Sequence, residues 1–538
     1  MFSASPTSRN ELFYSRPRYG VLATWFSMAV AAVTMIVCGP SLSARAAAPA
    51  QRVVRYRDFG AKGDGKTDDL EAFVAAHTFA NQHGLAVKAD DDATYYMGGK
   101  KRTVVIQTDT DFGTAAFIID DTHLQDRGAP TFLVSSRLEP FKLAGVSSLK
   151  RNQEKIDVSL PGTCLVTVTN SHVRRYIRFG ANRNNGSPQT DVFLVDKDGT
   201  VDRDTPIIWD FDRITAITAH PINESTLTIT GGRFTTIANA AESKYTYYSR
   251  GIAIRRSHVV VDGLEHHVTG EGDQGAPYGG FVNIGDCCYV TVQNTILTGR
   301  KTYRTIGSAG VPVSMGSYDI SLNRALNVSF VNCSQTNDIN DGRYWGIIGS
   351  NYCKNLVFDN CTFSRFDAHM GVANATIRNS TLGHQGINAI GSGIFIVENT
   401  TIHGRHLISL RSDYGSTWQG EFVIRNCVFV PAGGRPTSAS LIGGSYSGQH
   451  DFGYTCYMPE RITIDTLRID DSNHPANYQG PAIFANFNSR LTDDSYVEDF
   501  PYVRTKKVIL ENVTTASGKA LRVSDNPFMF KDVQVTTK

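Results

Sequence analysis

Short runs of alternating apolar and polar residues recur along the middle of this chain, and each run ends in asparagine. Alternation over roughly four to eight positions predicts a β-strand with one buried face. The closing asparagine suits a tight bend, because its side chain bonds the local backbone and tolerates a left-handed conformation. The six clearest copies lie at residues 289–294, 327–332, 355–360, 374–379, 394–399 and 422–426.

The spacing of these copies indicates a solenoid. Their terminal residues are separated by 38, 28, 19, 20 and 27 positions and are Asn294, Asn332, Asn360, Asn379, Asn399 and Asn426. A loosely kept period of about 20 to 50 residues is typical of stacked repeats with insertions in loops. Because β-branched residues abound and no helical period appears, we expect a parallel β-helix with asparagines bonded from coil to coil. A β-sandwich with asparagine-ended strands is the alternative, and six copies disfavour it.

The pattern divides the chain into four parts. We expect a signal peptide, an N-terminal cap, a less regular part, and regular coils with a closing C-terminal segment at residues 1–48, 49–99, 100–215 and 216–538. The less regular part has strand-like runs without the asparagines, so it contains irregular early coils or a small inserted β-domain. In the cap we expect a helix with Asp68 or Thr67 at its N-cap and Glu71 completing a capping box.

The N-terminus resembles an export signal. Three arginines come before an apolar run: Arg9, Arg16 and Arg18. The apolar run covers residues 21–37 and is followed by the small residues 44–48. This order is typical of a cleaved secretory peptide, which predicts a secreted or periplasmic protein. A retained membrane anchor is the first alternative, because the run is close to spanning length, and a lipid-attached Cys38 is the second.

Composition narrows the function classes. The 538 residues carry a net charge of +2, and 19% of them are charged. No long basic run or basic patch with interleaved aromatics appears, so we expect no nucleic-acid partner. Three cysteines each directly follow one of the repeated terminal asparagines, and they are Cys333, Cys361 and Cys427. This position predicts that they are small core residues that face inward. The pair Cys287–Cys288 could form disulfides in an oxidising compartment, with partners that the spacing does not define.

A phosphate-loop pattern occurs near the predicted cap. Residues 60–67 satisfy it literally, with Gly, four residues and Gly-Lys-Thr between a strand and a helix. However, Asp64 lies within the loop and Asp68–Asp69 begin the helix, so carboxylates would crowd the place of the phosphates. No apolar strand ending in a magnesium-holding aspartate follows. We therefore expect no nucleotide partner.

The segment 58–69, Asp-Phe-Gly-Ala-Lys-Gly-Asp-Gly-Lys-Thr-Asp-Asp, resembles the opening signature of the pectate-lyase-like superfamily. The resemblance implies an all-β fold, a single-stranded right-handed parallel β-helix with an N-terminal capping helix. It also implies activity on carbohydrates, but lyases, hydrolases and epimerases all carry this fold. The Asn-Thr-Asp, Gly-His-Gly and Arg-Ile-Lys motifs of polygalacturonases are absent. The chain is therefore not an ordinary polygalacturonase.

Stacked coils allow a candidate site to be located. Neighbouring coils lie about 4.8 Å apart, so residues at the same offset beyond each asparagine lie side by side. Those positions and the adjoining insertions hold arginine, aspartate and histidine in a stripe that could form a polysaccharide groove. As catalytic candidates we take Asp338, Asp367, His369, His384 and Asp413. As substrate-binding candidates we take Arg300, Lys301, Arg343, Tyr344, Arg365, Arg405, His406 and Arg411.

Two mechanisms fit such a stripe. A glycosidase would pair two carboxylates, either Asp338 with Asp367 or Asp367 with Asp413. A lyase or epimerase would neutralise a uronate carboxylate with arginine or lysine, while histidine, tyrosine or lysine takes the C5 proton. Asp367-Ala-His369 partly resembles the Asp-Pro-His motif of alginate C5-epimerases, with alanine in place of proline.

We favour β-elimination, because histidine and arginine outnumber well-placed acids in the stripe. We expect an anionic polysaccharide, because arginine binds carboxylates bidentately. Hydrolysis, C5-epimerisation and glycan binding without catalysis stay open as alternatives. The acidic loops make Ca²⁺ a candidate metal, although no loop has a diagnostic spacing. The expected partner is the polysaccharide, and membrane contact would occur only through an uncleaved N-terminal segment.

Overall fold

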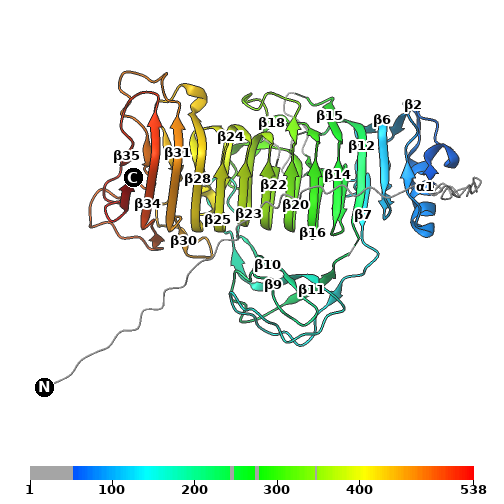
Figure 1. Cartoon of the computed structure of the whole chain (residues 1–538), viewed down its shortest axis with the longest axis horizontal. Helices are drawn as coiled ribbons and strands as arrows, with labels where there is room; N and C mark the ends of the chain where they lie inside the picture. Colours follow the sequence, from blue (N-terminus) through cyan, green and yellow to red (C-terminus); the bar gives the residue numbers. More distant parts are fainter. Residues whose placement is uncertain (1–52, 224, 243–246, 273–277, 346–347) are drawn as a thin grey trace, which may run out of the picture. The chain divides into compact units, whose positions relative to one another are not determined.

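The computed structural model describes residues 53–223, 225–242, 247–272, 278–345 and 348–538. The predicted signal peptide lies outside these residues. The described chain from residue 53 onward forms one compact unit of stacked β-coils (Figure 1). Every pairing within its 28-stranded main sheet is parallel, so the predicted all-β architecture of parallel coils is confirmed.

Three groups of strands build the main sheet. The first group is β1 (Val54–Arg55), β2 (Asp64–Asp68), β3 (Val87–Lys88), β4 (Thr94–Met97), β5 (Val104–Ile106), β6 (Thr110–Asp120), β7 (Phe132–Ser135), β12 (Leu227–Ile237), β13 (Ile252–Arg255), β14 (Val259–Asp262) and β15 (Glu265–Thr269).

The second group contains the repeated asparagines. It is β16 (Gly279–Gln293), β17 (Ile296–Leu297), β20 (Tyr318–Val331), β21 (Ser334–Gln335), β22 (Ile348–Asp359), β23 (Thr362–Arg378), β24 (Thr381–Ala389), β25 (Gly391–Glu398), β26 (Thr401–Gly404), β27 (His406–Leu410), β28 (Trp418–Pro431) and β29 (Ser440–Gly443). The closing group is β31 (Arg461–Ile469), β32 (Ala482–Phe484), β34 (Lys507–Thr515), β35 (Arg522–Ser524) and β36 (Gln534–Thr537).

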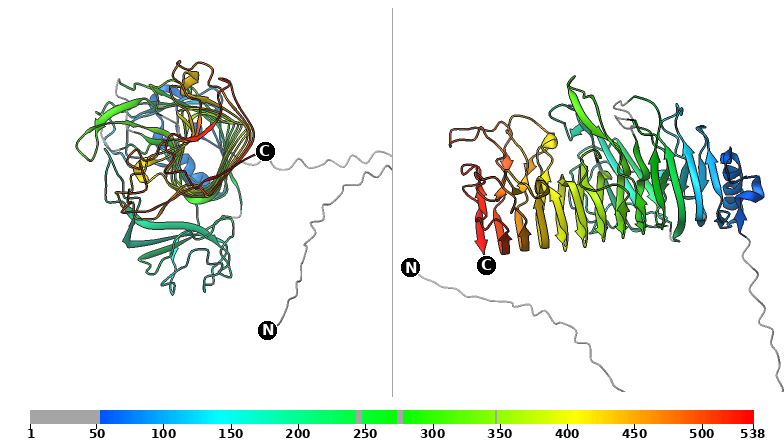
Figure 2. Two further views of the ribbon diagram at one scale, coloured as in Figure 1. Left: turned by 90° about the vertical axis from the view of Figure 1, so that its left-hand side faces the viewer. Right: turned by 90° about the horizontal axis from the view of Figure 1, so that it is seen from above.

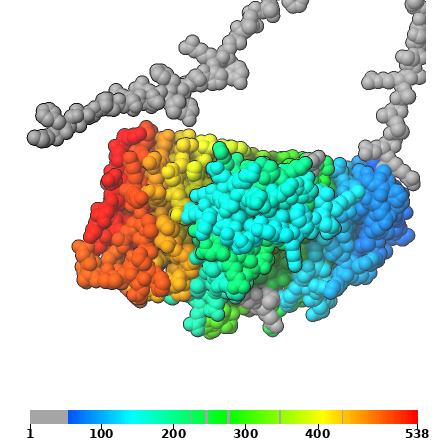
Figure 3. Space-filling model, turned by 90° about the horizontal axis from the view of Figure 1, so that it is seen from below, coloured from blue at the N-terminus to red at the C-terminus, as the bar shows by residue number. Residues whose placement is uncertain are grey.

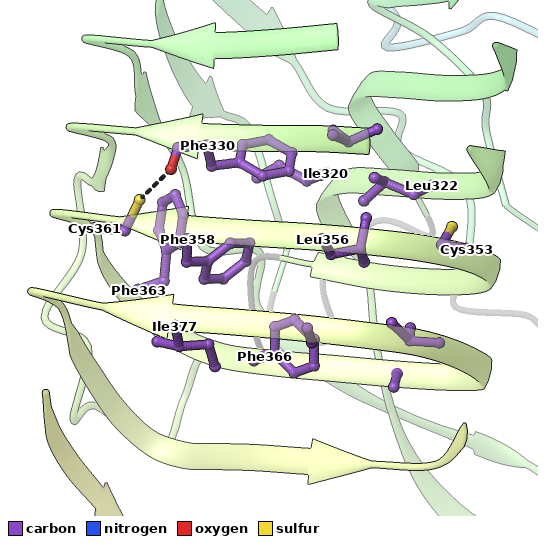
Figure 4. Packing of buried hydrophobic residues seen from close by; sticks show 14 of the residues in the cluster. Ile320, Leu322, Phe330, Cys353, Leu356, Phe358, Cys361, Phe363, Phe366 and Ile377 are labelled. Atoms are coloured by element: carbon purple, nitrogen blue, oxygen red, sulfur yellow. Dashed lines mark hydrogen bonds between the residues drawn. The ribbon is translucent and has the colours of Figure 1, made fainter. Parts of the chain in front are cut away.

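The core is a set of apolar columns that run from coil to coil. Alternate residues of each strand face inward, and parallel pairing places equivalent residues above one another. Phe330, Phe358 and Ile377 stack in this way inside the coils (Figure 4). One column continues through buried residues of nine strands, namely Val261, Val292, Phe330, Phe358, Ile377, Val397, Ile424, Ile464 and Leu510.

The cysteines belong to this core. Cys333, Cys361 and Cys427 are buried, in agreement with the predicted inward register. Cys361 Sγ lies 3.3 Å from the carbonyl oxygen of Phe330 (Figure 4). All eight cysteines of the described residues are buried and free, so Cys287 and Cys288 form no disulfide here.

The terminal asparagines occupy left-handed turns and bond across coils. Their φ angles lie between 49° and 54°. Asn332 Nδ2 donates to Asn294 Oδ1 at 2.6 Å, and Asn360 Nδ2 donates to Asn332 Oδ1 at 3.1 Å. Asn399 Nδ2 donates to Asn379 Oδ1 at 3.1 Å, whereas Asn379 Nδ2 donates to Asp359 in place of Asn360.

A second asparagine ladder lies at the start of the same strands. Asn355 Nδ2 donates to Asn327 Oδ1 at 2.8 Å, and Asn374 Nδ2 donates to Asn355 Oδ1 at 3.1 Å. These three residues also have left-handed φ angles of 54° to 59°. Both bends of the repeated strand are therefore fixed by side chains that bond the next coil.

A single α-helix of the described residues, α1 (Leu70–His83), packs Phe73 and Ala76 against the first coils. The predicted capping box is wrong. Asp69 precedes the helix, and its carboxylate accepts hydrogen bonds from the backbone of residues 62–63. Glu71 pairs with Arg102 instead, whose Nε lies 3.0 Å from Glu71 Oε1.

The loop before α1 uses its backbone donors internally. Asp64 accepts hydrogen bonds from the backbone N–H groups of Lys66 and Thr67. These are donors that a phosphate would need, and the local carboxylate already occupies them. No helix among the described residues is long and apolar enough to cross a membrane.

Residues 100–215 contain both structures that the sequence left open. The strands β5 to β7 are coils of the main sheet. The chain then leaves the coils and forms a separate four-stranded antiparallel sheet with its own core, which we name the insert. Its strands are β8 (Phe141–Lys142), β9 (Cys164–Arg175), β10 (Ser187–Val195) and β11 (Ala216–Pro221).

The insert packs against the middle coils. Leu165, Val192 and Leu194 of the insert form an apolar cluster with Cys288 and Leu326 of the coils. Seen from below, the insert covers part of the coil surface (Figure 3).

A buried ion pair adds to the same contact. Lys354 Nζ lies 2.9 Å from Asp191 Oδ1, and neither side chain is exposed to solvent by more than 2%. The position of the insert on the coils is therefore defined by apolar packing and by a paired charge.

The ladder gives a first test of the fold. Replacing Asn332 with alanine removes two inter-coil hydrogen bonds and puts a Cβ-bearing residue without a polar side chain in a left-handed turn. We expect the free energy of unfolding to fall by about 1–2 kcal/mol, measured by urea denaturation. Asn332→Gly is the matched control, because it loses the bonds but tolerates the turn, and it should lose less. Equal stability of Asn332→Ala and the wild type would contradict this role.

Candidate functional site

A groove of about 1280 Å³ crosses successive coils on the side that also faces the insert. Its floor consists of small polar residues that pair in register, Asn283 with Ser321 and Asn388 with Ser409. Its walls come from loops at both ends of the floor strands and from residues 178–187 of the insert. The parallel register thus brings residues more than 100 positions apart to one surface.

A chain of alternating charges runs through the centre of the groove. It contains Arg365, Asp367, Arg411, Asp413 and Arg178, and we name it the ionic chain. Arg365 Nη2 lies 2.8 Å from Asp367 Oδ2, and Arg411 Nη1 lies 3.1 Å from Asp367 Oδ1. Arg411 Nε and Nη2 also donate hydrogen bonds to the carboxylate of Asp413. Arg178 Nε lies 2.8 Å from Asp413 Oδ2.

Both carboxylates of the ionic chain are held in the ionised form. Asp367 has no exposed surface, and burial alone would raise its pKa. Arg365 and Arg411 outweigh burial and hold the pKa of Asp367 below its usual value. Burial of Asp413 is likewise outweighed by Arg411 and by Arg178, so its pKa is also lowered. Neither aspartate is therefore a proton donor at neutral pH.

Arg365 keeps unused hydrogen-bonding capacity. It lines the groove and is 5% exposed, with its guanidinium 5.0 Å from the ring of Trp345. Its Nε and Nη1 atoms are buried and have no hydrogen-bond partner among the described residues. Buried donors without partners cost folding free energy, so a ligand acceptor at this point would be favoured.

Three histidines line the groove and differ in environment. Burial and the nearby Arg411 lower the pKa of His369 to about 3, and its Nδ1 lies 3.0 Å from Asn351 Oδ1. Burial and Arg405 lower the pKa of His406 to about 4.

His384 Nδ1 lies 3.0 Å from the carbonyl oxygen of Ile339, which accepts a hydrogen bond from the N–H group of that nitrogen. The proton therefore sits on Nδ1, and the lone pair of the imidazole is on Nε2. Gln385 Nε2 lies 3.1 Å from this atom. His369 and His406 are neutral imidazoles at neutral pH, and His384 presents its accepting nitrogen along the groove wall.

The structure brings together most of the predicted stripe. Three of the proposed catalytic residues line the groove, and they are His369, His384 and Asp413. The fourth, Asp367, is buried and is paired with the lining residues Arg365 and Arg411. Four of the proposed substrate-binding residues line it as well, and they are Arg365, Arg405, His406 and Arg411.

The other predicted residues lie outside the groove. Arg300 is 1% exposed because it is bound inside the fold by Asp319, with Nε 3.2 Å from Oδ1. Lys301 Nζ donates to carbonyl oxygens of residues 271–272. Arg343 pairs with its neighbour Asp341 in an exposed loop.

Tyr344 and Asp338 share that outlying position. The guanidinium of Arg343 lies 5.8 Å from the Tyr344 ring, and Lys301 forms an isolated β-bridge with Tyr344. Asp338 is exposed and accepts a hydrogen bond from the backbone of Asn340. Asp338 is not among the residues that line the groove, and Asp367 is buried between Arg365 and Arg411, so the two do not form the predicted carboxylate pair.

Several groove residues have no strong signal in the sequence. Arg178 reaches the ionic chain from the insert, more than 230 positions before Asp413. Tyr318 donates its hydroxyl to Asp367 Oδ2 at 3.4 Å, and Trp345 stands beside Arg365. The aromatic residues could have been found from their place next to the stripe. Arg178 could not, because no periodicity connects the insert with a particular coil.

No group of three or more His, Cys, Asp or Glu side chains that could hold a metal ion occurs in the described part of the chain. The two acidic groups nearest the floor, Asp367 and Asp413, are occupied by arginines.

Comparison with known proteins gives partial matches. The chain is 27% identical over 128 residues to the capsule KL64-specific depolymerase of Klebsiella phage P510. That match covers 21% of this chain and 12% of the phage protein, so the chain spans far less than two thirds of this relative. No protein-family model matches the chain.

Solved structures share the fold at low identity. The tailspike gp61 of Pseudomonas phage phi297 aligns with a TM-score of 0.56 and 14% identity, over 90% of this chain and 83% of the tailspike. An exopolygalacturonase from Thermotoga maritima aligns with a TM-score of 0.42 and 11% identity, over 90% of each chain. The likeness to the tailspike supports the parallel β-helix fold.

The buried carboxylate of the groove can be tested directly. Asp367→Asn keeps the shape of the side chain but leaves Arg365 and Arg411 without this partner. We expect a loss of about 3 kcal/mol or more in the free energy of unfolding, because removing one partner of a buried ion pair leaves the arginine charges uncompensated.

The matched control for this substitution is Asp341→Asn, which removes a carboxylate paired with the exposed Arg343. Urea denaturation should show little change for the control. Similar stability of Asp367→Asn and the wild type would show that the ionic chain does not stabilise the groove.

The lowered pKa of His369 predicts a dependence of stability on pH. The pKa is about 3 in the folded state and about 6.5 in the unfolded chain, so the unfolded state binds the proton more readily. The contribution of His369 is therefore complete above about pH 6.5 and is lost progressively as the pH falls toward the folded pKa.

We expect the thermal midpoint of the wild type to fall between about pH 7.5 and 4.5, and the fall to be smaller for His369→Gln. Differential scanning calorimetry across this range measures both slopes. Parallel slopes for the two proteins would contradict a neutral imidazole at this position.

Proposed function

We propose that this protein binds an anionic polysaccharide in the groove and cleaves it by β-elimination at an acidic sugar. The observation that supports this most is Arg365, which is buried, lines the groove and has two guanidinium nitrogens, Nε and Nη1, without hydrogen-bond partners among the described residues. A carboxylate is the ligand group that guanidinium binds most strongly, by charge and by hydrogen bonds together. The partial match to a capsule depolymerase supports a polysaccharide as the substrate.

The charge balance of the groove supports an anionic substrate. Asp367 and Asp413 are each shared by two arginines of the ionic chain. Arg405 lines the groove and has no ion pair among the described residues. Two guanidinium groups, Arg365 and Arg405, thus retain binding capacity for acidic groups of successive sugars.

The protonation states favour elimination over hydrolysis. A hydrolase of the usual two-carboxylate type needs one protonated acid, and the ionic chain keeps Asp367 and Asp413 ionised. In the proposed elimination, Arg365 binds the uronate carboxylate and makes the C5 proton more acidic. We assign His384 as the base, because Nδ1 donates to the carbonyl oxygen of Ile339 and Nε2 is an acceptor, which the substrate would take over from the amide of Gln385.

The elimination transfers one proton to the base and breaks one C–O bond. Nε2 of His384 takes the C5 proton, the electron pair forms the C4–C5 double bond, and the C4–O bond breaks. The leaving oxygen takes a proton from water or from the imidazolium. The products are a new chain end with an unsaturated uronate and a shortened polymer.

Three further features belong to the proposal. We take the coils as right-handed, which is the hand of nearly all crossover connections between parallel strands. We take α1 as the cap of the first coil, since it packs on apolar residues that an open end would expose. We also propose export, because capsular and other large polysaccharides are found outside the cell.

Polymer binding and product chemistry together test the proposed function. Arg365→Gln should weaken binding of a uronate-containing polysaccharide by at least about tenfold, since a hydrogen bond to a charged group contributes about 1.5–3 kcal/mol. The matched control is Arg343→Gln, which removes an exposed guanidinium outside the groove and should bind as the wild type does.

A panel of acidic and neutral polysaccharides supplies the substrates. β-Elimination creates absorbance from unsaturated uronate ends in step with new reducing ends. Reducing ends without that absorbance would identify a hydrolase, and binding without new ends would identify a glycan-binding protein. No binding of any acidic polymer, or equal binding by both variants, would overturn the proposal.

A further inference from the structure

A hairpin rises from one wall of the groove. Its strands β18 (Thr302–Ile306) and β19 (Pro312–Gly316) are antiparallel, and β19 leads directly into β20 at Tyr318. Since Tyr318 begins a floor strand, the hairpin belongs to the wall at the start of the floor strands. Val313, Ser314 and Met315 of the hairpin line the groove.

A loop of the insert rises from the opposite wall. Residues 176–186 connect β9 with β10, and we name them the tongue. Arg178 pairs with Asp413, and the backbone N–H of Phe179 donates to the carbonyl oxygen of Asp413 at 2.9 Å. Asp413 follows β27, so this anchor lies at the end of the floor strands. The tongue and the hairpin therefore start from opposite sides of the groove.

The hairpin and the tongue meet above the floor. The backbone N–H of Ala309 donates to the carbonyl oxygen of Ala181 at 3.0 Å, and Ser308 Oγ donates to the carbonyl oxygen of Arg183 at 2.5 Å. Gly307 approaches so closely that an added Cβ would lie 2.4 Å from the oxygen of Ala181. The contact is thus a close backbone-to-backbone junction, which we name the arch.

The groove continues beneath the arch. Asn182 of the tongue and Met315 of the hairpin line the same groove as the floor residues Ser321 and Gly349. The view along the coils shows the hairpin and the insert projecting on neighbouring sides (Figure 2, left). Farther along, the groove extends to Asp525, beyond the part that the arch covers.

Asn182 takes part in the junction and also lines the groove. Its side-chain oxygen is buried without a hydrogen-bond partner among the described residues, and a Cβ added at Gly307 would lie 2.6 Å from it. Its side-chain nitrogen lies 3.5 Å from the sulfur of Met315 on the hairpin. Side chains as well as backbones therefore close the arch above the groove.

We infer that the arch makes the groove specific for polymer ends, so that a polysaccharide enters by threading a free end under it. A middle segment of a long chain cannot pass sideways through a junction of two backbones. This inference rests on the proposed function, since it concerns the route of the same substrate. The hairpin and the tongue are then the elements that determine which part of a polymer is recognised.

The test compares polymers with free and with blocked ends. The probe is the uronate-containing polysaccharide that the wild type binds, prepared with free ends or with biotin–streptavidin at both ends. We expect the wild type to bind the blocked polymer at least about tenfold more weakly. A shortened hairpin, in which Asn-Gly replaces residues 306–312, no longer reaches the tongue and should bind both forms alike.

A second variant keeps the length of the hairpin, so that the test does not depend on correct folding of the shortened one. Ser308→Ala with Ala309→Pro removes both donors of the arch and should reduce the discrimination between the two polymers. Equal binding of free and blocked polymers by the wild type would overturn threading and leave the proposed function intact. Full discrimination by the shortened hairpin would also overturn it. Failure of the wild type to bind either form would overturn the proposed function itself.

Discussion

Parallel pairing in register is the constraint on which this structure depends. Each coil bonds the next at strand spacing, so a residue type that recurs at one offset becomes a continuous column. Inside the coils the columns are apolar, as for Phe330, Phe358 and Ile377. At the bends they are asparagines bonded from coil to coil. On one outer face, the same rule produces the groove.

The groove combines rigid charge pairing with unused donors. Arg411 pairs at once with the buried Asp367 and with the partly exposed Asp413, and this fixes the positions of both without leaving either as an acid. Arg365 shares one of these carboxylates yet keeps two N–H groups free. Preorganised donors of this kind bind charge with little reorganisation. The ionic chain therefore acts as a scaffold, and Arg365 is the group that the scaffold presents.

The sequence predicted the features that follow from periodicity. The asparagine ladder, the inward cysteines and the parallel coils could be read from spacing and alternation. The offset from the repeated asparagines also grouped Arg365, His369 and Arg411, which line one groove. It did not separate them from Arg300, because spacing alone does not say whether a side chain turns into the fold toward an acid such as Asp319.

Features created by insertions could not be predicted in this way. Asp338 has a suitable offset, but it lies in an exposed loop, where its carboxylate accepts from the backbone of Asn340. Arg178 and the tongue reach the groove from a separate sheet, and their meeting with the hairpin depends on the tertiary placement of both. Long insertions have no period, so only the folded structure shows where they return.

The most direct measurement of the central claim is a crystal structure of the wild-type protein with a bound acidic oligosaccharide. The account predicts that the sugar lies along the floor of the groove, with a carboxylate oxygen within hydrogen-bonding distance of Arg365 Nε or Nη1. An oligosaccharide bound on another face of the coils, or in the groove with Arg365 untouched, would contradict it.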